Sequence, residues 1–261
     1  RDHDNNLLSF LVLCETFDCN DQPLKTNSRN NAVKIMNMDS EHKEPMFGLE
    51  QEFFISRKCG NRLVPISFPN NQSCPEPQGN FYCGVGGSNV YSRNLVELML
   101  KLLLKANIPI TGLNAEVAPA QWEFQVCSTG VDAADSLILL RYICNRVLET
   151  EHLYMDISSK PLDGDWNGSG CHINYSTNLM REEGGFKYIE SAVKNLSKKH
   201  DLHIKHYGDD NYLRLTGKHE TSSINEFTFS IGGRNTSIRI PHQTKINKCG
   251  YFEDRRPSSS L

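Results

Sequence analysis

Two pairs of glutamates lie in apolar stretches of the chain, where a charged side chain needs a partner. Glu50 and Glu52 are two residues apart, so a strand would place both carboxylates on one face. Glu116 and Glu123 are seven residues apart, again among apolar residues. Neighbouring carboxylates repel each other and shift each other's pKa, and a divalent cation removes that repulsion. The alternative for the first pair is a solvated edge, and the second pair alone is a weak signal. Together they predict four acids converging on metal.

A histidine and two neutral hydrogen-bonding side chains follow a glycine-rich turn. His172, Asn174 and Ser176 alternate along the chain, so a strand would present all three on one face. The turn at 167–170 allows a substrate to approach the backbone closely. A single histidine is more often a satisfied core residue than a ligand, and that alternative stays open. The pattern predicts one imidazole ligand beside two polar groups.

Arginines recur in the last fifty residues. They include Arg214, Arg234, Arg239 and Arg255, and Arg255 lies two residues after Glu253. The rigid fork of arginine suits carboxylates and phosphates, although any one of these arginines alone would be interpreted as a surface residue. Five acids with one histidine favour Mg²⁺ or Mn²⁺ over zinc. Such metals combined with arginines are what phosphoryl transfer requires.

The elements that must position these residues alternate between strands and helices. The patterns predict strands at 7–17, 46–56, within 110–127, at the end of 167–177, and at 225–231 and 236–241. They predict helices at 92–106, 132–149 with Asp132 as its N-cap, and 182–200. Residues 19–31, 57–88 and 206–223 are expected to be mostly loop, and the C-terminal tail is polar. Strands and helices interleave without a βαβ rhythm, so the predicted class is α+β.

Composition narrows the functional classes. The chain has 261 residues and a net charge of −3, which gives no electrostatic footprint for nucleic acid or for an anionic membrane. No apolar run approaches the roughly 18 residues that a membrane span needs. The nine cysteines are odd in number and contain no C-x-x-C pair, so free thiols in a reducing cytoplasm are expected. An organelle stays open as the location.

Several motifs together resemble the glutamine synthetase family of the eukaryotic type, from about residue 11 to residue 259. The stretches that carry the resemblance are Phe47-Gly-Leu-Glu-Gln-Glu52, Asn114-Ala-Glu-Val-Ala-Pro-Ala-Gln-Trp-Glu-Phe-Gln125, Trp166-Asn-Gly-Ser-Gly-Cys-His172, Arg214-Leu-Thr-Gly217, His219-Glu-Thr221 and Gly250-Tyr-Phe-Glu-Asp-Arg-Arg-Pro257. The resemblance implies an antiparallel sheet, backed by helices, that forms a funnel-shaped site. It also implies a catalytic domain over 25–261, preceded at 1–24 by the remnant of a β-grasp domain and a linker.

The resemblance implies a role for each matching residue. The metal ligands would be Glu50, His172 and Glu253 for one ion, and Glu52, Glu116 and Glu123 for the other. ATP would contact Glu123, Asn174, Ser176, Arg234, Arg239 and Tyr251. Glutamate would contact Trp166, Asn167, Gly168, Arg214 and Arg255. The catalytic residues would be Arg214, Arg234 and Glu220, the last on a mobile flap that takes a proton from ammonium.

The implied reaction joins ammonia to glutamate. ATP would phosphorylate the γ-carboxylate of glutamate, and ammonia would attack the resulting acyl phosphate. The implied partners are glutamate, ammonium and ATP, with Mg²⁺ or Mn²⁺ and a homo-oligomeric ring; nucleic acid and membrane are not expected. The family's N-terminal domain and final helical segment would be mostly missing from this chain. A non-catalytic or weakly active relative with a structural or binding role is therefore the alternative.

Overall fold

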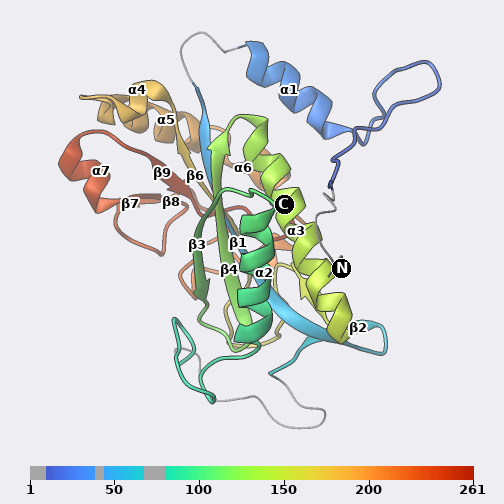
Figure 1. The fold of residues 1–261 in the computed structure, drawn as a ribbon. Helices are drawn as coiled ribbons and strands as arrows, with labels where there is room; N and C mark the ends of the chain where they lie inside the picture. The colour runs from blue at the N-terminus through green and yellow to red at the C-terminus, as the bar shows by residue number, and fades with distance from the viewer. Residues whose placement is uncertain (1–9, 39–43, 68–79) are drawn as a thin grey trace.

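A mostly antiparallel sheet forms the centre of the molecule (Figure 1). The structure is a computed structural model, and it describes residues 10–38, 44–67 and 80–261. Seven strands follow one another in the order β3–β4–β1–β6–β9–β8–β7, while β2 and β5 also pair with β1. The strands are β1 (Met46–Cys59), β2 (Arg62–Pro65), β3 (Ile110–Ala115), β4 (Gln121–Thr129), β5 (Tyr154–Asp156), β6 (Cys171–Ser176), β7 (Phe229–Ile231), β8 (Ile238–Ile240) and β9 (Phe252–Asp254). Within this sheet β7 and β8 run parallel to each other.

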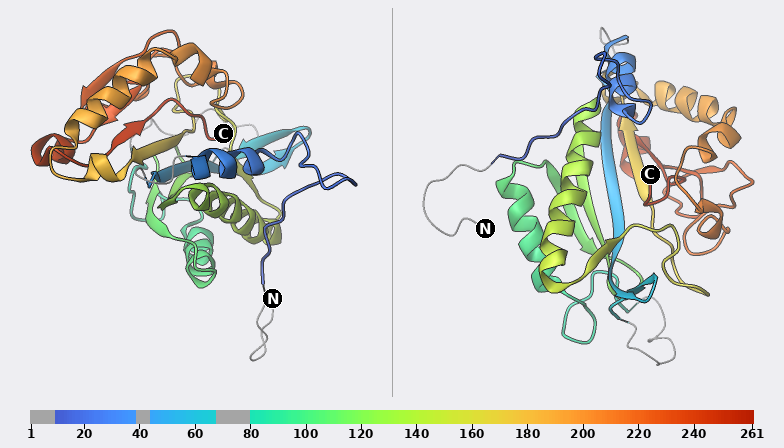
Figure 2. Two further views of the ribbon diagram at one scale, coloured as in Figure 1. Left: turned by 90° about the horizontal axis from the view of Figure 1, so that it is seen from above. Right: turned by 90° about the vertical axis from the view of Figure 1, so that its right-hand side faces the viewer.

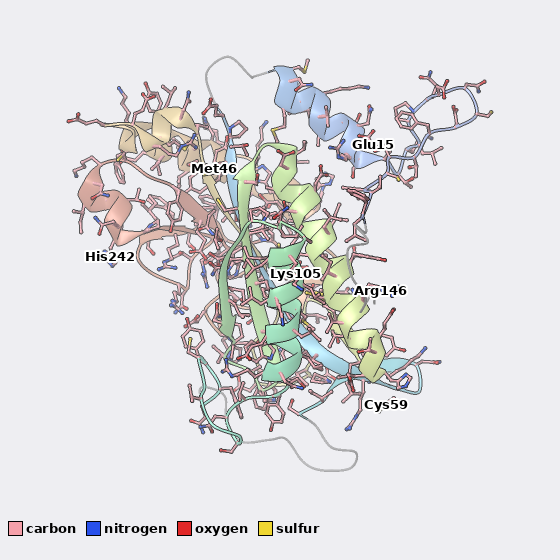
Figure 3. The ribbon with its side chains drawn as sticks, viewed as in Figure 1. Glu15, Met46, Cys59, Lys105, Arg146 and His242 are labelled. Carbon is pink, nitrogen blue, oxygen red and sulfur yellow. The ribbon has the colours of Figure 1, made fainter. Side chains whose placement is uncertain are left out.

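The long strand β1 organises the sheet because it pairs with β2, β4, β5 and β6. Figure 3 shows Met46 and Cys59 at its two ends. Leu49, Phe53 and Ile55 alternate along β1 and are buried in the main core. Since side chains alternate across a strand, the residues between them point to the opposite face. This alternation separates a core face of the sheet from a face that is free to carry polar groups.

Two helices cover the core face. They are α2 (Arg93–Lys105) and α3 (Val131–Leu148), and Figure 2 shows them side by side along β1. Val96, Met99 and Leu103 of α2 are buried at helical spacing in the same core as Phe53 and Phe124. Complete burial of each such side chain contributes about 1.5–3 kcal/mol, so this layer fixes the positions of β1 and β4.

A second, smaller core supports the other half of the sheet. Phe186, Ile189 and Val193 of α5 (Phe186–Ser197) pack with Ile238 of β8 and Phe252 of β9. The remaining helices are α1 (Ser28–Met38), α4 (Asn178–Arg181), α6 (His200–Ile204) and α7 (His242–Asn247), with short 3₁₀ turns at Glu149–Glu151 and Asn211–Leu213. Among the described residues, none of the helices is both long enough and apolar enough to span a bilayer.

The α+β class is confirmed, together with the strands predicted at 46–56 and within 110–127 and the helix predicted at 92–106. The helix predicted at 182–200 is α5, which is shorter because residues 182–185 form a turn before it, and a separate helix, α6, begins at His200. The two strands predicted near 225–241 exist but are only three residues long each.

Three predictions about local structure are wrong. Residues 10–17 form no strand, since only an isolated bridge joins Phe17 to Pro23; residues 7–9 of that prediction lie outside the described residues. Asp132 does not cap α3, because Gly130 occupies the N-cap position and Asp132 lies in the first turn. The loop predicted at 19–31 ends early, since α1 begins at Ser28.

Candidate functional site

A polar pocket lies on the face of the sheet opposite α2 and α3. It contains six glutamates, four arginines and two histidines. The charged residues are Glu50, Glu52, Glu116, Glu123, Glu220, Glu253, Arg214, Arg234, Arg239, Arg255, His172 and His219, and the others are Tyr82, Asn114, Gln125, Asn167, Gly168 and Thr221. The structure thus brings together all six predicted metal ligands, from four different strands and the segment after β3. The prediction that Glu50 and Glu52 share one face of a strand is confirmed.

Strand register explains the convergence. Glu50 on β1 lies directly opposite His172 on β6, and Glu52 lies directly opposite Glu123 on β4. On the next pair of strands, Asn174 of β6 lies opposite Glu253 of β9. Like charges placed directly opposite each other destabilise a sheet, so the pairing of Glu52 with Glu123 favours protonation or a compensating cation.

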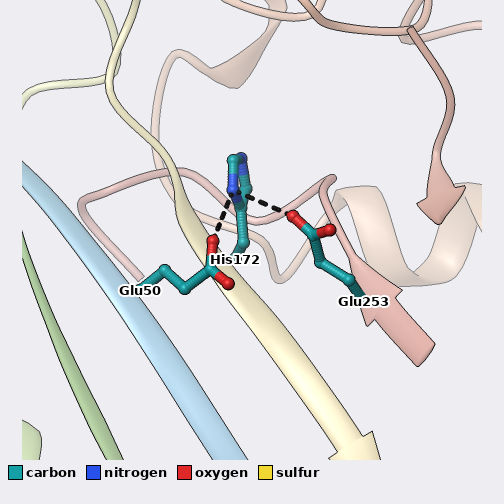
Figure 4. Close-up of side chains that lie close together, drawn as sticks. All are labelled: Glu50, His172 and Glu253. Atoms are coloured by element: carbon teal, nitrogen blue, oxygen red, sulfur yellow. Dashed lines mark hydrogen bonds and ion pairs between the residues drawn. The ribbon is translucent and has the colours of Figure 1, made fainter. Parts of the chain in front are cut away.

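Glu50, His172 and Glu253 form the first cluster (Figure 4). The Nδ1 atom of His172 lies 3.3 Å from Oε2 of Glu50 and 3.4 Å from Oε1 of Glu253. One ligand atom from each residue lies within 4.8 Å of the others. Burial, together with the charge of Arg255, lowers the pKa of His172 well below its usual value. The imidazole is therefore neutral, which is the form that binds a metal.

Two arginines hold the Glu253 carboxylate of this first cluster. Arg255 Nη1 bonds Oε1 of Glu253, and Arg239 Nη1 lies 3.1 Å from Oε2. Glu253 itself is only 2% exposed. Glu253 therefore has two cationic partners in a buried position.

Glu52, Glu116 and Glu123 form the second cluster, and their ligand atoms also lie within 4.8 Å of one another. Burial, reinforced by the neighbouring Glu116, raises the pKa of Glu52 to about 8. Burial, reinforced by Glu50 and Glu52, raises the pKa of Glu123 to about 9. Burial also raises the pKa of Glu116. These shifts come first from burial and then from neighbouring carboxylates, so the cluster favours protonation or a bound cation over three free negative charges.

The donor set of the two clusters fits divalent cations of the Mg²⁺ or Mn²⁺ type. It consists of five carboxylates and one neutral imidazole, and hard cations prefer oxygen ligands. The raised pKa values of the second cluster agree with this fit, because a bound cation would stabilise the ionised carboxylates.

A short segment containing Glu220 closes one side of the pocket. His219 and Glu220 both adopt left-handed backbone conformations, which side chains other than glycine adopt rarely. Oε2 of Glu220 lies 3.3 Å from Nη1 of Arg234, and the Glu220 carbonyl accepts a hydrogen bond from Arg255. Nε2 of His219 lies 2.9 Å from Oδ1 of Asp165. This segment, 218–221, is tied to two other loops around the pocket mouth.

The turn at 167–170 lies against Arg214. A Cβ atom on Gly168 would lie 2.4 Å from the Ser159 carbonyl oxygen and 2.6 Å from Cγ of Arg214, so only glycine fits. Arg214 is buried, and its Nη2 donates to the carbonyls of residues 255–257 while Nε donates to Asn211. Arg214 therefore holds the backbone of the pocket lining in position and also contributes a positive charge to the pocket.

Four predicted site residues lie outside the pocket lining. Trp166 is buried in a small apolar cluster with Phe54. Asn174 lies just behind the lining and donates to Oε1 of Glu50 at 2.7 Å. Ser176 accepts a hydrogen bond from Arg181, and Tyr251 is 42% exposed.

Sequence reasoning assigned no role to five residues of the pocket, which are Tyr82, Asn114, Gln125, His219 and Thr221. Asn114 and Gln125 each occupy a position two residues from a cluster glutamate, a spacing that places both on one face of a strand. That spacing could have revealed them. Tyr82 lies in a stretch of Gly, Asn and Cys with no periodicity, so the sequence offered no signal for it.

Comparison with known proteins gives a consistent result. Residues 25–204 match the family model described as glutamine synthetase, catalytic domain. The chain is 46% identical over 257 residues to a putative glutamine synthetase of Acanthamoeba polyphaga mimivirus, covering 98% of this chain and 71% of that protein. It is 48% identical over 256 residues to glutamine synthetase of Bos taurus and 47% identical to that of Homo sapiens, covering 96% of this chain and 67% of each relative.

Proposed function

This chain belongs to the glutamine synthetase family, and we propose that its pocket catalyses the ATP-dependent joining of ammonia to glutamate through a γ-glutamyl phosphate. The observation that carries the proposal is the convergence of five glutamates and one histidine, with four arginines, on one face of the sheet. Carboxylates bind cations, and arginines bind carboxylate and phosphate, so the pocket suits glutamate and ATP as substrates of such a ligase.

The two clusters would each hold one Mg²⁺ or Mn²⁺. The first would use Glu50, His172 and Glu253, and the second would use the carboxylates of Glu52, Glu116 and Glu123. When bound, such ions supply charge stabilisation to phosphate oxygens during phosphoryl transfer. Glu50 and His172 face each other across paired strands, so the backbone ladder sets their separation.

The substrates would occupy opposite sides of these clusters. We assign glutamate to the side of Asn167, Gly168 and Arg255, where the glycine turn leaves its backbone open. Trp166 and Arg214 would support that side of the pocket, Trp166 through its packing with Phe54 and Arg214 through its hydrogen bond to the Arg256 carbonyl. The nucleotide would lie toward Arg234 and Arg239, with Glu123, Asn174, Ser176 and Tyr251 as further contacts.

Glu220 would complete the reaction. Its backbone is held by Arg255 and its carboxylate faces Arg234 across the pocket mouth. We assign it the proton released when ammonium becomes ammonia, which then attacks the acyl phosphate and expels phosphate. Segment 218–221 would exclude water from that intermediate, which is the general use of such lids.

The test is glutamine formation from glutamate, ammonium and ATP with Mg²⁺ or Mn²⁺, followed together with release of phosphate. We expect ADP, phosphate and glutamine in equal amounts. Glu220→Gln should lower turnover by about 10²–10⁴-fold, the usual contribution of a general acid or base. The matched control is Glu183→Gln, an exposed glutamate that is remote from the pocket lining.

Two results would contradict the proposal. One is nucleotide and metal binding without any glutamine formation, which would support a non-catalytic binding role. The other is full activity in Glu220→Gln, which would remove the proton-transfer role while leaving the ligase assignment in place.

A further inference from the structure

Neutral amides hold the carboxylates of the second cluster. Asn114 donates through Nδ2 to Oε1 of Glu116 at 2.7 Å, and Gln125 donates through Nε2 to Oε1 of Glu123 at 2.6 Å. Gln121 donates through Nε2 to Oε2 of Glu52 at 3.3 Å. Each of the three glutamates therefore has an amide donor of its own.

A neutral donor has a particular effect in a negatively charged cluster. It stabilises the ionised carboxylate and fixes one of its oxygens, which sets the direction of the other. Unlike lysine or arginine, it adds no charge that would replace the cation. Glu253 of the first cluster shows the contrast, because its partners are Arg239 and Arg255.

The backbone is shaped to admit one of these amides. Gly112 on β3 pairs with Gln125 on β4. A Cβ atom on Gly112 would lie 2.5 Å from Oε1 and 2.7 Å from Cδ of Gln125. The Gln125 side chain therefore lies across the glycine, and any other residue at position 112 would displace it. A site built this closely around a neutral side chain indicates that the position of the amide matters.

Gln121 joins the second cluster to the glycine turn. It is 2% exposed, and besides Glu52 its Nε2 approaches the Gly168 carbonyl oxygen at 3.1 Å. Oε2 of Glu52 also accepts the backbone N–H of Gly170 at 2.7 Å. The orientation of the Glu52 carboxylate is thus fixed by the same turn that borders the proposed glutamate side.

We propose that Asn114, Gln121 and Gln125 are positioning residues that orient the carboxylates of the second cluster for a divalent cation. The inference rests on the metal binding assigned under the proposed function. These residues bind no substrate in this scheme; they act through Glu116, Glu52 and Glu123. Gly112 contributes to the same positioning because it leaves space for the Gln125 side chain.

The test is titration of the metal-free protein with Mn²⁺, followed by electron paramagnetic resonance and calorimetry, without substrates. Gln125→Met keeps a similar volume but removes the donor, and we expect the affinity of one of two sites to fall by about 10–100-fold. Asn114→Leu should act in the same direction. Gly112→Ala changes none of the donors or ligands but displaces the Gln125 amide. We therefore expect a smaller loss of Mn²⁺ affinity at the same site.

Gln51→Met is the matched control. Gln51 is also a buried glutamine of the sheet, but its side chain bonds the backbone carbonyl of Glu52, Ser259 and Arg141 rather than a cluster carboxylate. We expect it to lower the thermal midpoint and to leave Mn²⁺ affinity unchanged, which separates a structural loss from a positioning loss.

The outcomes are distinguishable. If the unaltered protein binds no Mn²⁺, the metal assignment fails. If it binds Mn²⁺ and the variants at 112, 114 and 125 bind it equally well, the metal assignment stands and the positioning role is wrong. Should Gln125→Met fail to fold, the folded Gly112→Ala and Asn114→Leu proteins decide the question.

Discussion

The two carboxylate clusters of the pocket solve the same electrostatic problem in different ways. Glu253 of the first cluster is buried against Arg239 and Arg255, so the protein itself neutralises much of that charge. In the second cluster, amides orient the glutamates without neutralising them. The carboxylates of the second cluster repel one another when ionised, and only Glu52 is attracted by the charges of Arg214 and Arg255.

The pKa shifts of the second cluster follow from this difference. The pKa rises to about 8 for Glu52 and to about 9 for Glu123, mainly through burial. Strongly raised pKa values of this kind cluster at functional sites. We therefore propose that the second cluster depends more on a bound cation than the first.

The largest expected effect comes from removing a ligand of either cluster. Glu123→Ala and His172→Ala should each reduce the number of bound Mn²⁺ ions from two to one, measured by calorimetry. Each should also lower turnover by about 10³-fold, since a catalytic ion contributes several kcal/mol and each 1.36 kcal/mol is a factor of ten. The two variants should lose different ions, so their Mn²⁺ resonance spectra should differ.

Unchanged stoichiometry in His172→Ala would show that this histidine is a core residue rather than a ligand. Replacement of His242, on α7 and outside the pocket lining, by Ala is the control for loss of an imidazole. That variant should keep both ions.

A second prediction concerns pH and is smaller. A glutamate with a higher pKa in the folded state than its ordinary 4.5 binds its proton more strongly when folded, so its ionisation destabilises the fold. The metal-free protein should therefore lose stability as pH rises from about 4.5 through about 9. We expect Glu123→Gln to flatten this profile and to raise the thermal midpoint at pH 9 by about 5 °C relative to the unaltered protein.

Magnesium gives the complementary measurement. At pH 8, added Mg²⁺ should raise the thermal midpoint of the unaltered protein, because the ion stabilises the ionised carboxylates. An identical pH profile in Glu123→Gln and in the unaltered protein would contradict the view that the second cluster is uncompensated.

The sequence predicted the cluster members because period and spacing are local properties. Two glutamates two residues apart in an apolar strand must share a face, and Glu50 and Glu52 do. The contribution of α2 to the main core could also be predicted, since its apolar residues have helical spacing. Which glutamate joins which cluster was beyond spacing, because it depends on strand register. The pairings of Glu52 with Glu123 and of Glu50 with His172 are long-range properties of the sheet.

The C-terminal segment shows a second limit of sequence reasoning. It is polar and would be expected at the surface, yet Arg256, Ser258 and Ser259 are fully buried. Arg256 is satisfied by a bidentate pair with Asp254 and by contacts to the rings of Tyr207 and Phe227. Composition could not predict this, because the rings of Tyr207 and Phe227 that contact Arg256 come from segments far from it in the chain. The amides of Asn114 and Gln125 are a different case, because their spacing from the predicted Glu116 and Glu123 does carry a signal.

The smallest effect is expected from a substitution that makes the first cluster resemble the second. Arg239→Gln replaces a cation beside Glu253 by an amide, so the first cluster should retain more negative charge and bind Mn²⁺ more tightly. Because Arg239 is partly exposed, we expect about 1 kcal/mol, or about fivefold in affinity, measured without nucleotide. Arg146→Gln, which makes the same change of charge at an exposed position on α3, should leave the affinity unchanged. If Arg239→Gln weakens Mn²⁺ binding instead, the arginine orients Glu253 more than it neutralises it. In that case the two clusters would differ in the identity of their positioning partners and not in their charge.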